Sequence, residues 1–247
     1  MRSDIVLSQL ERLRWAVIRT LVAVLVAAVA GYAVRHPLLD LLRRPLALDG
    51  REIPLHFLRL TEPFFAYLKV ALFAGVFFVV PFIVRELWVA LAPLVLGDGA
   101  RRLVWPVTVS ASALFYGGAA VCYFLVLTAA VPFLLGFGGG QVEPYITISD
   151  YLSLVMMLLL ASGVMFELPL VLIVLARFGM VDARMLGRFR GYALVLNALV
   201  SAMLTPTPDA YTMVLMMLPL AVLYEASVLL VRLFGRPRQS HVGAPAT

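Results

Sequence analysis

Long apolar runs, each able to cross a lipid bilayer, recur along this sequence. The longest, from Leu103 to Val142, contains no charged side chain, and a helix needs only about 20 mostly apolar residues to cross a bilayer. Over the whole chain 63% of the residues are apolar and 14% are charged, whereas soluble domains average roughly 45 to 50% and about 25%. The sequence therefore predicts an integral membrane protein.

Six of these runs are predicted to form transmembrane helices. They cover residues 15–34, 67–94, 104–135, 151–177, 191–208 and 211–231. No polar stretch between them is large enough to fold separately, so we expect one all-α, polytopic membrane domain over residues 1–234. Residues 235–247 have Pro, Gly, Ser and His without periodicity, and we expect a disordered cytoplasmic tail.

The distribution of charge predicts the orientation of the helices. An even number of spans places both termini on one side, and the segments on that side hold twelve basic residues against four acidic ones. The opposite segments hold six basic residues against seven acidic ones, although the 35–66 loop alone contains five Arg. The positive-inside rule therefore predicts a multi-pass protein of the cytoplasmic membrane with cytoplasmic termini. Membrane topology accounts for the basic balance without nucleic acid as a partner.

Groups that could support catalysis are few. His36, His56 and His241 lie outside the predicted spans, and Cys122 is the only cysteine. Ser162 has no His partner at membrane depth, so a Ser-His dyad cannot be drawn, and small residues at a helix contact are the simpler interpretation. We expect neither an enzyme nor a cofactor or metal site.

Glu167 is the sharpest functional candidate inside a predicted span, because a charged group in hydrocarbon is costly. Pro169 lacks an N–H and its ring collides with the Met165 carbonyl, so the helix should kink beside the carboxyl group. A polar concavity at that depth would result. The alternative is a protonated or hydrogen-bonded Glu with a structural role at a helix contact.

Three further motifs have both structural and functional interpretations. In TEPF, Thr61 is a candidate N-cap, Glu62 lies in the first turn, and Pro63 stands where a missing N–H is harmless. TPTPD at 205–209 predicts a helix-breaking turn. Glu225, near the inner end of the last span, either snorkels to the interface or pairs with a nearby basic residue.

Together these motifs resemble the TatC family, the multispanning receptor subunit of the twin-arginine translocase. The resemblance rests on TEPF, YLKV, APL before an inner Arg-Arg pair, FELP, LTPTPD and LYE in this order, and it extends from about Ser8 to Phe234. The positions that match the family motifs are Thr61, Glu62, Pro63, Phe64, Pro93, Pro169, Thr205, Pro206, Asp209 and Glu225.

The resemblance implies a glove-shaped bundle of six transmembrane helices that binds twin-arginine signal peptides. It also implies lipid contact, a homo-oligomer, and small single-span partner subunits of the TatA and TatB type. With these partners such a protein exports folded proteins using the protonmotive force. The competing function is a secondary transporter of a small solute with an intramembrane carboxylate. A membrane-embedded hydrolase would need a nucleophile and a base that the sequence does not supply.

The chain departs from the family where signal recognition is concerned. The family's HLxELR is QLERLR here, so Arg12 takes the usual Glu position and Glu11 lies one residue earlier. The family's APxLYxxERR is APLVLGDGARR, with Ala100 where Glu is expected and Asp98 two residues before it. In TPTPDAYTM, Met213 replaces a Gln linked to partner docking, so partner contacts are expected to differ.

A third departure adds an acid. The family's PxILYQxW is PFIVRELW in this chain, which introduces Glu86. We hypothesise that Glu11, Glu86 and Asp98 rebuild an acidic patch, because two signal-peptide guanidinium groups need carboxylate partners in bidentate geometry. The alternative is a set of solvated ion pairs, joining Glu11 to Arg14 and Glu86 to Arg85 or Arg102.

Overall fold

The computed structural model describes residues 2–46, 53–92, 102–136, 145–177, 179–204 and 209–234. These residues are nearly all helical, which confirms the predicted fold class, and their one strand-like feature is an isolated pairing of His56 with Thr147. The elements are α1 (Arg2–Ala33), α2 (Arg35–Arg43), the short helix η1 (Arg44–Leu46), α3 (Glu62–Leu91), α5 (Val104–Val121), the π-helix η3 (Cys122–Leu127), α6 (Thr128–Gly136), α7 (Ile148–Met165), α8 (Leu168–Arg177), α9 (Ala183–Arg188), α10 (Arg190–Leu204) and α11 (Ala210–Phe234).

Five helical stretches in the described residues are long and apolar enough to cross a membrane. They are Leu10–Ala33, Glu62–Ala90, Val104–Gly136, Ile148–Arg177 and Ala210–Leu233. They correspond to five of the predicted spans, and α10 corresponds to the remaining one, 191–208. At 15 residues, α10 is roughly 22 Å long, shorter than the ~30 Å of a bilayer's hydrocarbon.

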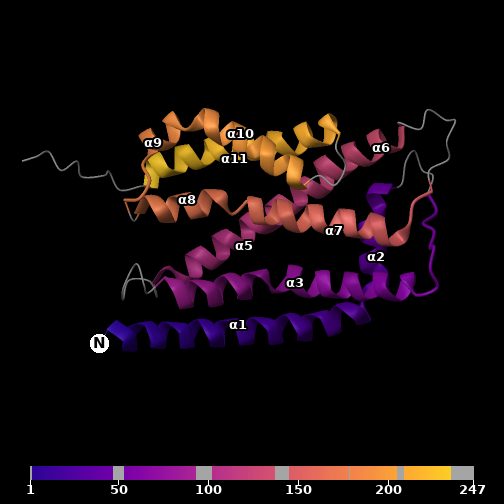
Figure 1. Cartoon of the computed structure of the whole chain (residues 1–247), viewed down its shortest axis with the longest axis horizontal. Helices are drawn as coiled ribbons and strands as arrows, with labels where there is room; N and C mark the ends of the chain where they lie inside the picture. Colours follow the sequence, from indigo (N-terminus) through magenta and orange to yellow (C-terminus); the bar gives the residue numbers. More distant parts are fainter. Residues whose placement is uncertain are drawn as a thin grey trace, which may run out of the picture.

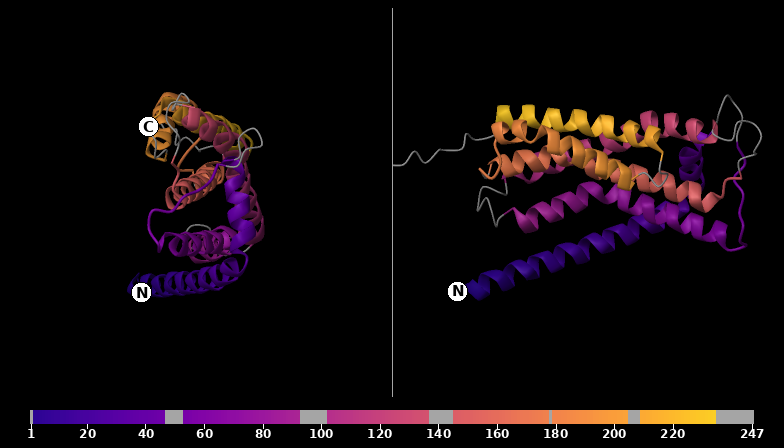
Figure 2. Two further views of the ribbon diagram at one scale, coloured as in Figure 1. Left: turned by 90° about the vertical axis from the view of Figure 1, so that its right-hand side faces the viewer. Right: turned by 45° about the horizontal axis from the view of Figure 1, so that its top comes forward.

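The long helices lie side by side, with α1 beginning at the same end of the bundle at which α8 and α11 finish (Figure 1). We call this the terminal end. At the opposite end, α2 runs across the long helices, and we call it the α2 end. Seen end-on, the helices follow an open arc from α1 to the α10–α11 pair (Figure 2), which is the curved bundle that the resemblance implied.

Two groups of buried side chains hold the arc together. The larger one joins α2, α3, η3 and α7 through residues such as Leu42, Val70, Leu127 and Leu152. The smaller one joins α8, α9 and α11 at the terminal end and includes Ala176, Leu186, Val228 and Val231. The α2 end and the terminal end of the bundle are therefore each packed by their own set of helices.

Close helix contacts occur where small residues face each other. A Cβ atom at Gly75 of α3 would lie 2.7 Å from the Val24 carbonyl oxygen of α1, and one at Gly31 would lie 3.0 Å from the Ala74 Cβ. Without a hydrophobic driving force between helices in lipid, such close backbone approach supplies the packing energy. The other side of α1 is exposed, with Val29 at 75%.

At the contact between α5 and α7, a glycine of each helix packs against a phenylalanine ring from the other side of the contact. A Cβ atom at Gly118 would lie 2.5 Å from the Phe166 ring, and one at Gly163 would lie 2.6 Å from the Phe115 ring. Between them the Ser162 hydroxyl donates to the Gly118 carbonyl at 2.9 Å. Ser162 therefore takes part in a helix contact, as the sequence indicated.

Candidate functional site

Glu86 on α3 is the one charged side chain that is buried in the described part of the chain. Its Oε1 accepts a hydrogen bond from Arg85 Nη1 at 2.5 Å, and its Oε2 accepts one from Arg19 Nη1 at 3.5 Å. The Glu86 side chain is 5% exposed, whereas the Arg19 side chain is 61% exposed and the Arg85 side chain 44%. This carboxylate therefore already binds two guanidinium groups, one of them from α1.

The rest of the predicted acidic patch is only partly within the described residues. Glu11 is exposed on α1, eight residues before Arg19 and thus about 12 Å from it along the helix axis. No ion pair joins Glu11 to Arg14 or to another residue that the structure describes. Asp98 lies outside the described residues.

The predicted alternative for Glu86, an ion pair with Arg85 or Arg102, is confirmed by the pair with Arg85. Arg85 pairs with Glu86, but the second described partner is Arg19 and not Arg102. Sequence reasoning missed Arg19 as a site residue. Arg19 lies within the first predicted span, and this position could have identified it. A basic side chain at the centre of a span costs about 2.5 to 3.5 kcal/mol on insertion scales.

The helix breaks beside Glu167 as predicted. α7 ends at Met165 and α8 begins at Leu168, because Pro169 cannot donate to a carbonyl four residues earlier. The Glu167 N–H donates to the Val164 carbonyl at 3.1 Å, which closes the chain more tightly than an α-helix does. Glu167 Oε1 is buried without a hydrogen-bond partner among the described residues, and an unpaired buried oxygen is costly.

At the α2 end, Glu62 connects two elements that are distant in sequence. Its Oε2 accepts hydrogen bonds from the N–H groups of Leu58 and Arg59 at 2.8 and 3.4 Å. Its Oε1 accepts one from the N–H of Ser149, in the first turn of α7, at 3.2 Å. Glu62 therefore accepts from amides in the bend before α3 and from an amide in the first turn of α7.

The predicted cap at Thr61 is wrong in its mechanism. Thr61 stands at the N-cap position of α3, but its side chain accepts no capping hydrogen bond, and Glu62 accepts from the preceding amides instead. Pro63 lies in the first turn as expected, and Phe64 is exposed. Pro93, Thr205 and Pro206 lie outside the described residues.

Lys69 contributes to the same end of the bundle and was not predicted as a site residue. Its Nζ donates to the hydroxyl oxygens of Ser149 and Ser153 at 2.9 and 3.0 Å. Lys69 lies two turns after Glu62 on α3, so both residues hold α7 against α3. Their combination locates the start of α7 at the α2 end.

Asp209 and Glu225 fix the α10–α11 hairpin. Asp209 Oδ1 accepts a hydrogen bond from the Thr212 N–H at 2.6 Å, which caps the start of α11. Glu225 Oε2 accepts one from Arg190 Nη2 at 2.8 Å, with both side chains exposed. The predicted pairing of Glu225 with a basic residue is confirmed.

Comparison with known proteins covers almost the whole chain. The profile of the family described as Sec-independent protein translocase protein (TatC) matches residues 8–219. The chain is 36% identical to the Sec-independent protein translocase protein TatC of Desulforapulum autotrophicum, over 94% of this chain and 85% of that protein. It is 33% identical to the protein of the same name from Aquifex aeolicus, over 93% of this chain and 95% of that protein.

The fold is also shared with a solved structure. A crystal structure of the twin arginine translocase receptor TatC superposes with a TM-score of 0.80 at 33% sequence identity, and the match covers 92% of this chain and 100% of that chain. The similarity therefore includes the arc of helices and not only single motifs.

Proposed function

The chain belongs to the TatC family of Sec-independent protein translocase proteins, and we propose that it is the receptor subunit of a twin-arginine translocase in the cytoplasmic membrane. It binds the twin-arginine signal peptides of folded passenger proteins. With small single-span subunits of the TatA and TatB type, and with further copies of itself, it supports export driven by the protonmotive force. A secondary transporter is not favoured, because the relatives that span most of the chain are named protein translocase components.

The terminal end is the cytoplasmic side in this proposal. Five of the basic residues at this end, Arg177, Arg184, Arg188, Arg190 and Arg232, lie on α8, α9, α10 and α11. The α2 end contains acidic residues such as Asp40, Glu62 and Asp150 beside its basic ones. An excess of basic residues on one side supports a cytoplasmic location for that side.

The ion pairs of Glu86 are the observation that supports the proposal for signal-peptide recognition. Twin-arginine recognition needs a carboxylate that accepts guanidinium groups, and Glu86 accepts two from this chain. Arg19 is the weaker of the two partners, since its contact is 3.5 Å long and its side chain is mostly exposed. A guanidinium group of the signal peptide takes the place of Arg19, while Glu11 and Asp98 bind the second one.

Binding of synthetic signal peptides to the purified protein tests this exchange. Glu86→Gln should weaken binding of an Arg-Arg peptide roughly tenfold, as expected when one charge-assisted hydrogen bond is lost. Glu11→Gln and Asp98→Asn should also weaken it and reduce the preference over a Lys-Lys peptide. Arg19→Gln should strengthen binding, because it removes the internal competitor.

Arg14→Gln is the matched control for Arg19→Gln, since Arg14 is exposed on the same helix and forms no ion pair with a described acid. Equal affinities of wild type and the Glu86, Glu11 and Asp98 variants, for both peptides, would show that the acids are solvated ion pairs without a role in recognition.

Glu167 is proposed to line the path of the passenger or of a partner subunit within the membrane. The support is its buried Oε1 without a partner, next to the break between α7 and α8. Glu167→Leu should abolish export in a reporter assay, and Glu167→Gln shows whether the charge is needed. Export at the wild-type level in the Leu variant would assign Glu167 to structure or to lipid contact. Asp40→Asn is the control, because Asp40 is exposed and lies on α2, away from the break between α7 and α8.

A further inference from the structure

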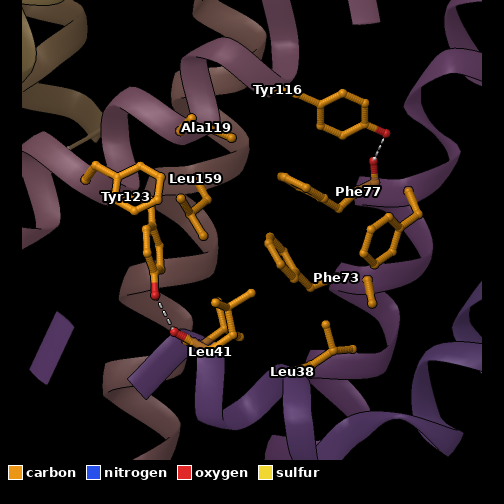
Figure 3. A pocket seen from close by; sticks show the side chains of 13 residues that line it. Leu38, Leu41, Phe73, Phe77, Tyr116, Ala119, Tyr123 and Leu159 are labelled. Atoms are coloured by element: carbon orange, nitrogen blue, oxygen red, sulfur yellow. Dashed lines mark hydrogen bonds between the residues drawn. The ribbon is translucent and has the colours of Figure 1, made fainter. Parts of the chain in front are cut away.

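A cavity of about 300 Å³ opens on the bundle near the α2 end, between α2, α3, α5, η3 and α7. Figure 3 shows its wall, with Phe73 and Phe77 of α3 facing Tyr123 of η3 and Leu159 of α7. Leu38 and Leu41 of α2 line it on the side of the α2 end. Almost all of the lining is hydrocarbon.

The two polar groups in the lining are already satisfied. The Tyr116 hydroxyl donates to the Phe77 carbonyl at 3.1 Å, and the Tyr123 hydroxyl donates to the Leu41 carbonyl at 2.6 Å (Figure 3). A water molecule in a cavity needs two or more polar partners, and these hydroxyls have already used their protons. The cavity therefore suits an apolar occupant.

Small residues create the space, and exposed aromatic residues surround its mouth. Ala74 and Ala119 are buried in the wall, while Phe78 and Phe124 are exposed. The mouth thus faces the hydrocarbon region in which the helices lie. One turn of a helix, roughly 10 Å across with its side chains and 5.4 Å long, already exceeds the cavity volume. A thin, flexible chain can enter it with part of its length, whereas a partner helix cannot.

A basic residue, Arg44, lies next to the α2 wall of the cavity. Arg44 follows Leu41 by three residues, so the two lie on the same face of the α2–η1 segment. Arg44 is exposed and directly follows α2, whose Leu38, Leu41 and Leu42 line the cavity. The neighbouring charges on α2 are Asp40 and Arg43, so the segment remains net positive.

We propose that this cavity binds one acyl chain of a membrane phospholipid whose phosphate pairs with Arg44. The acyl chain lies between α2, α3 and η3 and completes the apolar packing of the larger core. The phosphate oxygens accept hydrogen bonds from the Arg44 guanidinium, which matches phosphate geometry. This site is independent of signal-peptide recognition, because Glu86 and Glu11 lie toward the terminal end.

Native mass spectrometry of the detergent-purified full chain with added phosphatidylglycerol tests the proposal. One phosphatidylglycerol molecule should remain bound to the wild type. Arg44→Gln should lower its apparent affinity roughly tenfold, as for a lost charge-assisted hydrogen bond, and should not change retention of diacylglycerol with the same chains. Ala120→Phe should abolish retention of both lipids, because Ala120 lines the cavity from its exposed side.

Two matched variants control for surface effects. Ala113→Phe adds the same ring at an exposed position of α5 that does not line the cavity, and Arg59→Gln removes an exposed charge elsewhere at the α2 end. Both should retain phosphatidylglycerol like the wild type. Equal retention in all four variants, or no retention by the wild type, would overturn the proposal.

A second measurement does not depend on variants that fold. Phosphatidylglycerol with a photoactivatable group in its acyl chain, added in equimolar amount, should label Phe124 and Leu41. Labelling spread evenly over exposed α1 residues such as Val29 would mean unspecific lipid contact and would refute the site. If Ala120→Phe lowers co-purification of a partner subunit and leaves lipid retention unchanged, the occupant is a partner side chain, and the lipid assignment is wrong.

Discussion

At the scale of single residues, tyrosine hydroxyls donate hydrogen bonds to backbone carbonyls of neighbouring helices. Pro81 lies inside α3 and has no N–H, so the Phe77 carbonyl lacks its usual donor, and the Tyr116 hydroxyl supplies one at 3.1 Å. Unpaired backbone groups are not tolerated in hydrocarbon. Three other tyrosine hydroxyls also donate to backbone carbonyls, in the pairs Tyr123 with Leu41, Tyr151 with Leu42, and Tyr224 with Leu186. The Leu41 and Leu186 carbonyls in addition accept the N–H groups of Arg44 and Phe189.

Tyr116→Phe should therefore destabilise the protein although it removes a single oxygen atom. We expect a loss of about 0.6 to 2 kcal/mol, the range for a hydrogen bond within a membrane protein or to a buried carbonyl. The midpoint of thermal unfolding in detergent measures it. Tyr192→Phe, at a position that is 74% exposed, is the control and should not change the midpoint.

The acidic site residues could be found in the sequence, but their partners on distant helices could not. Glu62, Glu86 and Glu167 stand out because carboxylates in or beside apolar runs are rare. The partner of Glu86 on α1 is 67 residues away, and the amide of Ser149 that Glu62 accepts from is 87 residues away. Such pairs depend on how the helices pack, and hydropathy contains no information about it.

At the scale of elements, glycines decide which helix faces meet. Gly75 admits the backbone of α1, and Gly118 and Gly163 admit phenylalanine rings between α5 and α7. The sequence shows these residues only as small positions in apolar runs. Their role follows from the partner, since Gly117, next to Gly118, faces open space.

Gly75→Leu should separate α1 from α3. The new side chain would collide with the Val24 carbonyl and the Ala28 backbone, and neither can move without shifting α1. Overpacking of this kind costs about 1 to 3 kcal/mol, and the contact between Arg19 and Glu86 should be lost with it. Unfolding midpoints and signal-peptide affinity measure both effects.

Gly117→Leu provides the comparison for that variant, because a Cβ atom added there meets no neighbouring atom within 4 Å. It should leave the unfolding midpoint and the peptide affinity at their wild-type values. A Gly75→Leu protein as stable as the Gly117→Leu protein would show that α1 does not depend on close packing.

At the scale of the whole molecule, the spans were predictable and their arrangement was not. Charge-free runs identify the helices that cross the bilayer, whereas lipid tails are as apolar as the side chains and give no preference for one face. The crossing helix α2 was missed, since its arginines placed it within a loop. The arc arises from specific contacts such as those of Glu62, Lys69 and the tyrosines.

The proposed orientation predicts which residues react from which side of intact cells. Arg184→Cys, exposed on α9 at the terminal end, should react with a membrane-impermeant maleimide only after the cells are opened. Leu60→Cys, at a position that is 95% exposed near the α2 end, should react from outside. The native Cys122 is buried and should not react with the maleimide. The reverse pattern would invert the topology.

The packing of α1 on α3 also sets an order for biosynthesis. This first helical hairpin contains its main interface as soon as Leu91 has left the ribosome, so it can close before α5 is made. The Glu62 carboxylate, in contrast, accepts from the N–H of Ser149, which is synthesised 87 residues later. Closure of the α2 end therefore follows the synthesis of the first turn of α7, while α8 to α11 are still to be made.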